Sequence, residues 1–193
     1  MSVWAAQELS VKPVEDALGG TDCRQADLTW PNPTGGGLEG VPVEVDKVIA
    51  SHHLWMAVIA VAGTHRALQL ASDYVGDRKV FGRPLASFEN TRHRLAELYA
   101  KLVAVQRQVD QALEADVHAR LAPVEAASAL ICARGVHDRA VDQALQFHGG
   151  YGYMREYPIA HAFADAQYLR HADARLADPR EVVARWLEVE RAS

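Results

Sequence analysis

The chain has 193 residues, of which 49% are hydrophobic and 23% are charged, and its formal net charge is -5 at pH 7. This length and composition fit an ordinary globular domain with a sizeable core. The negative charge argues against a nucleic-acid-binding protein, because binding to phosphate backbones needs a basic surface. Two widely separated cysteines, Cys23 and Cys132, indicate neither a disulfide framework nor a zinc site.

The chain carries no predicted export or membrane signal. Its first residues lack the basic start and the apolar run of a signal peptide. The most apolar stretch, residues 45–71, is interrupted by His and Arg side chains, so we expect no segment that spans a bilayer. The sequence therefore predicts a cytoplasmic protein without a membrane partner.

Residues 1–44 differ in composition from the rest, since they hold four of the eight prolines and six of the thirteen glycines. Short runs at 3–6, 9–14 and 22–30 predict β-strands, and the Pro- and Gly-rich stretch 31–37 predicts a loop. Two or three strands do not form an independently stable sheet. We therefore expect this segment to lean on the helices or to complete a sheet supplied elsewhere.

From Val45 onward, apolar residues recur at three- and four-residue intervals, which is typical of helices that pack lengthwise against one another. Four long helices are predicted, over about 45–77, 95–115, 123–148 and 158–177. A short helix is predicted after Asp178, where a capping Asp, a Pro and a Glu stand in order. The pattern predicts a mainly α fold: an antiparallel up-and-down four-helix bundle over 45–193, preceded by the β-rich segment 1–44.

The break at 78–85 gathers chemically useful side chains between two helices. Arg78, Lys79 and Arg83 supply charge, Phe81 supplies a ring, and Gly82 allows close approach to the backbone. One interpretation is ordinary solvated charge. The other is an anion site, because guanidinium groups bind phosphate oxygens in a bidentate manner and an aromatic ring can support a heterocycle.

A second stretch, residues 146–153, ends a helical run in glycines interleaved with aromatic residues. Gly149 and Gly150 fit a helix stop with a left-handed cap. They also fit close contact between backbone and a nucleotide, to which the amide of Gln146 could hydrogen-bond. Both interpretations stay open from the residues alone.

Nine histidines raise the question of a metal site. His52 and His53 are adjacent and therefore point to different faces of a helix. His171 lacks a His or carboxylate four residues on, and His161, with Asp165 there, offers only a pair of ligands. The sequence predicts no metal.

Read together, the two stretches resemble the C-terminal half of an acyl-CoA dehydrogenase. The resemblance covers about 150 residues and residues 1–44 are similar to the last strands of the family's middle β-domain. The segments that carry it are His65–Leu68, Asp73–Tyr74, the R-x-x-F-G turn of 78–85 and the Q-x-h-G-G-x-G-y segment of 146–153.

The resemblance implies a FAD site and a redox reaction. By it, Arg78 and Phe81 reach the FAD of a neighbouring subunit, while Gln146, Gly149 and Gly150 line the adenosine-pyrophosphate end. In this family a carboxylate removes the α-proton of an acyl-CoA thioester while the β-hydrogen leaves as hydride to the flavin, giving the 2-enoyl-CoA. The substrate implied is thus an acyl-CoA.

The candidate base departs from the family pattern. Where the family usually has Glu-Gly-Thr, this chain has Asp173 followed by Ala174 and Arg175. Asp173 is the candidate catalytic base, and its alternative interpretation is an ordinary surface acid. Some members carry the base on the first C-terminal helix, where this chain has His52 or His53 and no carboxylate.

The family's helical N-terminal domain and first half of the β-domain have no counterpart in this sequence, and they supply much of the flavin and acyl walls. We therefore expect a subunit that completes a FAD site in a heteromer with a longer acyl-CoA dehydrogenase-like chain, with Trp55 and Trp186 as interface anchors. The alternatives are a non-catalytic scaffold or regulatory bundle and a self-sufficient homo-oligomeric dehydrogenase. The protein alone is expected to bind FAD weakly or not at all.

Overall fold

The computed structural model describes residues 10–13, 26–29, 44–172 and 177–192. The two described strands, β1 (Ser10–Pro13) and β2 (Ala26–Thr29), pair antiparallel with Ser10 opposite Thr29. They fall inside two of the predicted strands. The strand predicted at 3–6 and the loop predicted at 31–37 lie outside the described residues.

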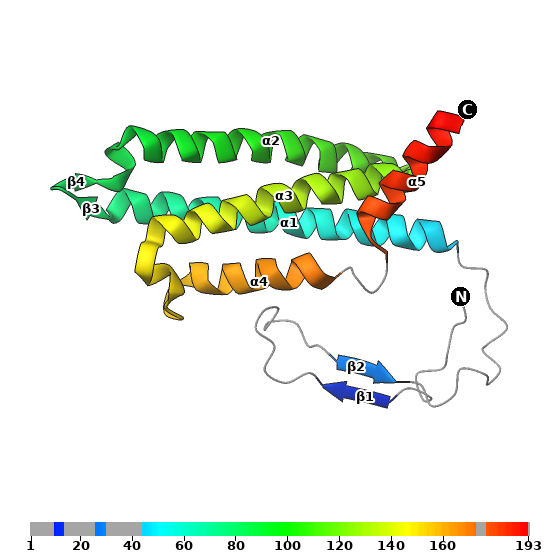
Figure 1. Ribbon diagram of the computed structural model, residues 1–193, viewed down its shortest axis with the longest axis horizontal. Helices are drawn as coiled ribbons and strands as arrows, with labels where there is room; N and C mark the ends of the chain where they lie inside the picture. Colours follow the sequence, from blue (N-terminus) through cyan, green and yellow to red (C-terminus); the bar gives the residue numbers. More distant parts are fainter. Residues whose placement is uncertain (1–9, 14–25, 30–43, 173–176, 193) are drawn as a thin grey trace.

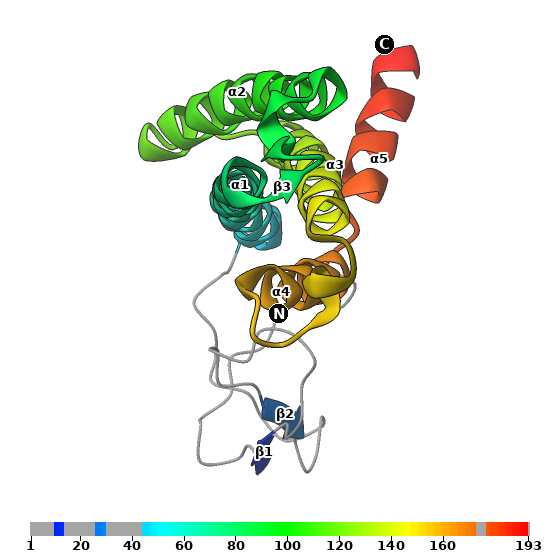
Figure 2. The same ribbon diagram turned by 90° about the vertical axis from the view of Figure 1, so that its left-hand side faces the viewer.

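Apart from a two-stranded hairpin within 78–85 and the short connections, the rest of the described chain is helical, which confirms the predicted fold class. The helices are α1 (Val45–Asp77), α2 (Glu89–Val117), α3 (Pro123–His148), α4 (Pro158–Ala172) and α5 (Pro179–Ala192). The first four run along the long axis of the molecule, and α5 crosses them at one end (Figure 1). Figure 2 shows α1 and α3 side by side, with α2 on one side of this pair and α4 on the other.

The central pair, α1 and α3, makes the most extensive helix–helix contact in the bundle. Just over half of its buried side chains are alanines, and the larger ones include Leu54, Leu130 and Val141. Small side chains let two helix backbones approach closely, because little volume separates them. At Gly63 an added Cβ would lie 2.4 Å from Nε2 of the buried His137.

The ends of α2 and α5 show how these helices are capped. At the end of α2, the N–H of Arg120 donates to the carbonyl of Ala115 at 2.8 Å and the N–H of Ala119 to that of Asp116 at 2.9 Å. This is a Schellman cap, whose left-handed position normally holds glycine. Here Ala119 occupies it with φ 53°. The predicted cap of α5 is present, since Asp178 Oδ1 accepts the N–H of Arg180 at 2.9 Å.

Helix α1 is long enough and apolar enough, by length and composition alone, to cross a membrane. The expectation that His and Arg side chains exclude such a segment was therefore wrong on those criteria. Core helices of water-soluble proteins meet the same criteria, and α1 lies at the centre of the bundle. Its apolar side chains divide between the core and the surface: Leu54 is fully buried, whereas Trp55 is 58% exposed.

Candidate functional site

The stretch 78–85 forms a small β-hairpin that projects from one end of the bundle (Figure 1). Strands β3 (Lys79–Val80) and β4 (Arg83–Pro84) pair antiparallel, with Val80 opposite Arg83. The two-residue turn between them has positive φ at both positions, 53° at Phe81 and 78° at Gly82. That combination is a type I′ turn, which normally holds Asn-Gly or Gly-Gly.

Phe81 is therefore an unusual residue for its position. A side chain with a Cβ is disfavoured in the left-handed region by about 1–2 kcal/mol. Its ring is 93% exposed, so contacts with the described residues do not recover this cost. Strained backbone of this kind is concentrated at functional sites.

The second stretch, residues 146–153, which we call the glycine turn, lies where α3 ends at His148. Gly149 has φ 56° and ψ -134°, so it needs the freedom of glycine although it does not adopt the left-handed helical cap of the first interpretation. A short 3-10 helix, η3 (Gly149–Tyr153), follows. Gly152 is required by packing, since an added Cβ would lie 3.0 Å from both the Cδ1 and the carbonyl oxygen of Leu145. Gly150 has neither constraint and faces open space.

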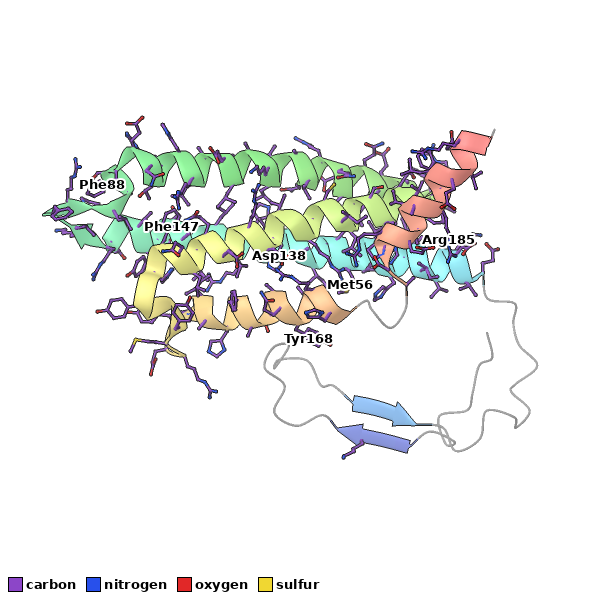
Figure 3. All side chains as sticks on the ribbon, viewed as in Figure 1. Met56, Phe88, Asp138, Phe147, Tyr168 and Arg185 are labelled. Carbon is purple, nitrogen blue, oxygen red and sulfur yellow. The ribbon has the colours of Figure 1, made fainter. Side chains whose placement is uncertain are left out.

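The fold brings the hairpin and the glycine turn together. The guanidinium of Arg78 lies 5.7 Å from the centre of the Tyr151 ring, a cation–π contact between the two stretches. Figure 3 shows Phe88, which follows the hairpin, and Phe147, which belongs to the second stretch, at the same end of the molecule. The amide of Gln146 is exposed there as well. All five predicted cofactor-binding residues thus lie at one end of the bundle.

The three cations of the hairpin are exposed and make different contacts. Within the described part of the chain, none of Arg78, Lys79 and Arg83 pairs with a carboxylate. Arg83 instead lies over the ring of Phe88, 4.1 Å from its centre. Arg78 and Lys79 are therefore the better candidates for an anion, and Arg83 has a packing role that the sequence did not indicate.

The candidate base, Asp173, lies outside the described residues. Ala177, four residues further along the same chain, is anchored to α1, because Nε2 of His53 lies 3.1 Å from its carbonyl oxygen. His53 is fully buried, so its ring is not accessible to a substrate as a base. No group of three or more His, Cys, Asp or Glu side chains among the described residues could hold a metal ion.

Buried histidines make the stability of the bundle sensitive to acid. Burial lowers the pKa of both His53 and His137 from the ordinary value of 6.5. In the unfolded chain these side chains take up protons near pH 6.5, whereas in the folded protein they do so only at a lower pH. The free energy of unfolding should therefore fall as the pH drops below 6.5, by up to about 1.4 kcal/mol per pH unit for each histidine.

Chemical denaturation at a series of pH values measures this slope. His53→Gln keeps a donor at the position of Nε2 but does not titrate, so its stability should fall less steeply over this range. An equal slope for the two proteins would contradict the assignment to His53.

Comparison with known proteins places this geometry in context. The family described as the acyl-CoA dehydrogenase C-terminal domain matches residues 45–187. The long-chain specific acyl-CoA dehydrogenase of Rattus norvegicus mitochondria is 33% identical over 119 residues, which cover 62% of this chain and 28% of the relative. The (2S)-methylsuccinyl-CoA dehydrogenase of Cereibacter sphaeroides is 31% identical over 154 residues, 79% of this chain and 28% of the relative.

Solved structures agree at the level of the fold. The butyryl-CoA dehydrogenase of Megasphaera elsdenii superposes with a TM-score of 0.80 at 24% identity, over 93% of this chain and 49% of that one. The chain thus spans less than a third of the two curated relatives and about half of this structure. The family match nevertheless covers most of the sequence. The chain belongs to the acyl-CoA dehydrogenase family, and the matched part is its C-terminal helical domain.

Proposed function

We propose that this protein is an acyl-CoA dehydrogenase-like subunit whose hairpin and glycine turn form one wall of a FAD site. The reaction proposed for the assembled site is α,β-dehydrogenation of an acyl-CoA thioester, for which FAD accepts the hydride. Members of the family are FAD-dependent flavoproteins. The observation that carries the proposal is the exposed ring of Phe81, held on a strained turn next to Arg78.

The residues at this end of the bundle fit a flavin dinucleotide. Arg78 and Lys79 are exposed cations without a carboxylate partner among the described residues, as a pyrophosphate requires. The Phe81 ring offers an exposed apolar face for a heterocycle. Gly150 leaves its backbone open on a side where nothing lies within 4 Å of an added Cβ. Gln146 adds an exposed amide that can donate and accept hydrogen bonds.

These residues supply one wall only. Four pockets lined by described residues lie away from the hairpin. The ring of Phe81 is 93% exposed, so a dinucleotide that lies against it needs a second polypeptide surface to enclose it. Oligomers are usual in this family, and Trp55 and Trp186, 58% and 44% exposed, are available for subunit contacts.

We propose that the second surface belongs to a longer acyl-CoA dehydrogenase-like chain. By the family resemblance, a base is held on the first C-terminal helix or on the segment around residue 173. The helix position holds His52 or the buried His53 in this protein, and neither is a carboxylate. The base is then either Asp173 or a carboxylate of the other chain, and a heteromer accommodates both. A homo-oligomer relies on Asp173.

Native mass spectrometry with flavin absorbance tests this assembly. The protein is purified from its own cells without disrupting its complexes. We expect a longer chain and FAD in the same particle. A colourless homo-oligomer would overturn the proposal and favour a scaffold, and a yellow homo-oligomer would retain the FAD site but exclude the heteromer.

Phe81→Asn separates the proposed function from stability. Asn tolerates positive φ and forms type I′ turns with a following Gly, so the free energy of unfolding should rise by about 1 kcal/mol. Loss of the ring should weaken FAD binding by the assembled protein about fivefold or more, as loss of a stacking partner does for nucleic-acid bases. Thermal unfolding and FAD titration measure the two effects.

Ala119→Gly is the matched control. It relieves a positive φ of the same size, 53°, on the connection between α2 and α3, and should also stabilise the protein. FAD binding should be unchanged. If Phe81→Asn binds FAD as tightly as the parent protein, the exposed ring has no part in the site.

A further inference from the structure

We propose that four aromatic side chains in and next to the glycine turn position the guanidinium of Arg78 for the phosphates of the dinucleotide. We call Tyr74, His148, Tyr151 and Tyr157 the aromatic cluster. The inference rests on the proposed FAD site, and it assigns a positioning role to residues to which the sequence motifs gave no role.

The aromatic cluster is a continuous chain of ring contacts. Tyr74 and His148 are stacked, with ring centres 3.9 Å apart and an angle of 24° between their planes. His148 meets Tyr157 edge to face at 6.0 Å, and Tyr157 meets Tyr151 at 5.5 Å. The guanidinium of Arg78 lies over the Tyr151 ring, 5.7 Å from the ring centre.

This chain of contacts closes on itself. The backbone N–H of Arg78 donates to the carbonyl of Tyr74 at 2.9 Å. Tyr74 and Arg78, the two ends of this chain of contacts, are therefore one helical turn apart at the end of α1. The Tyr74 hydroxyl donates to the carbonyl of His148 at 3.4 Å, and Nδ1 of His148 lies 2.8 Å from the carbonyl of Ala144. Backbone and ring contacts therefore join α1, α3 and the glycine turn around Arg78.

The closed arrangement matters because an exposed arginine is flexible. An Arg side chain carries about 2 kcal/mol of rotamer entropy, part of which is lost when it binds phosphate. Tyr151 restricts the guanidinium before a ligand arrives, while Arg78 itself stays exposed. Tyr151 is 43% exposed and His148 only 6%, so the cluster is buried at His148 and reaches solvent at Tyr151, next to Arg78.

A double-mutant cycle distinguishes positioning from direct contact. FAD affinity is measured by flavin fluorescence on the assembled protein after removal of its bound flavin, for Tyr151→Leu, Arg78→Ala and the double variant. A positioning role predicts about two- to fivefold weaker binding for Tyr151→Leu, the usual size of an exposed cation–π contact. It also predicts that the double variant binds no more weakly than Arg78→Ala, because Tyr151 acts only through Arg78.

Tyr151→Phe should bind FAD with the parental affinity, because the ring face is kept and only the hydroxyl is lost. Tyr99→Leu is the control: its ring is 61% exposed, lies on α2 outside the hairpin and the glycine turn and makes no contact in the cluster, so affinity should stay at the parental value. Circular dichroism checks that each variant keeps its helices. Tyr151→Met, which keeps a long apolar side chain without an aromatic face, replaces Tyr151→Leu if that variant does not fold.

Additive losses in the double variant would overturn the positioning role and make Tyr151 a direct ligand contact. Parental affinity for Tyr151→Leu would also overturn it and leave the FAD proposal intact. Parental affinity for Arg78→Ala would overturn the proposed FAD site itself, together with the inference built on it. The two failures are thus distinguishable in one set of titrations.

Discussion

Arg78→Ala is expected to strip FAD from the assembled protein. Arg78 is the cation that joins the hairpin to the glycine turn, and within the described part of the chain it has no carboxylate partner. Charge-assisted hydrogen bonds contribute about 1.5–3 kcal/mol each, so its loss should weaken FAD binding about ten- to a hundredfold. The ratio of flavin to protein absorbance after gel filtration measures the loss.

Arg83→Ala is the matched control, because it removes the same side chain from the same hairpin. Arg83 lies on the Phe88 ring, so its removal should leave most of the flavin in place. Arg78→Lys should be intermediate, since a lysine keeps the charge but not the planar pair of donors. Equal flavin content for Arg78→Ala and the parent protein would mean that Arg78 is only a solvated charge.

Gly63→Ala is expected to destabilise the bundle although alanine is the better helix former. The gain in helix propensity is about 1 kcal/mol. Against it, the new Cβ would lie 2.4 Å from Nε2 of His137, whose ring is only 4% exposed and cannot swing into solvent without leaving the core. Overpacking costs about 1–3 kcal/mol or more at such positions, so the net free energy of unfolding should fall by about 1–2 kcal/mol.

Chemical denaturation measures this change, and two further variants isolate its cause. Gly135→Ala, on an exposed position of α3 with nothing within 4 Å of the new Cβ, should instead stabilise the protein by about 1 kcal/mol. Adding Gly63→Ala to His137→Ala should cost nothing further, because the ring that clashes is gone. A stabilising Gly63→Ala would show that α1 and α3 separate easily.

The helices were predictable because their signals are local. The predicted limits at Val45, Pro123 and the glycine pair after His148 agree with α1 and α3. Helix α2 begins at Glu89, earlier than the predicted stripe from Leu95, because its first turn is mostly exposed and carries few apolar residues. The described part of α4 runs from Pro158 to Ala172, and the next four residues of the predicted helix lie outside the described residues.

The two stretches of the candidate site could be singled out from the sequence, but their geometry could not. Phe81 and Gly82 were recognised as a break, yet no sequence rule places Phe in a type I′ turn, so the hairpin was missed. The contact between Arg78 and Tyr151 joins segments far apart in the sequence, and only the bundle brings them together. Gly152 was grouped with Gly149 and Gly150, but it serves packing against Leu145, which depends on tertiary structure.

The alanine-rich contact between α1 and α3 also sets which changes this protein can accept. In most cores the harmful substitutions are those that remove volume and leave cavities. Here just over half of the buried positions of the central pair already hold alanine. A substitution at these alanines can remove little side-chain volume, whereas most substitutions would add volume. A saturation mutagenesis scan would therefore show intolerance to growth along these two helices, and drift at those positions would be confined to Ala, Gly and Ser.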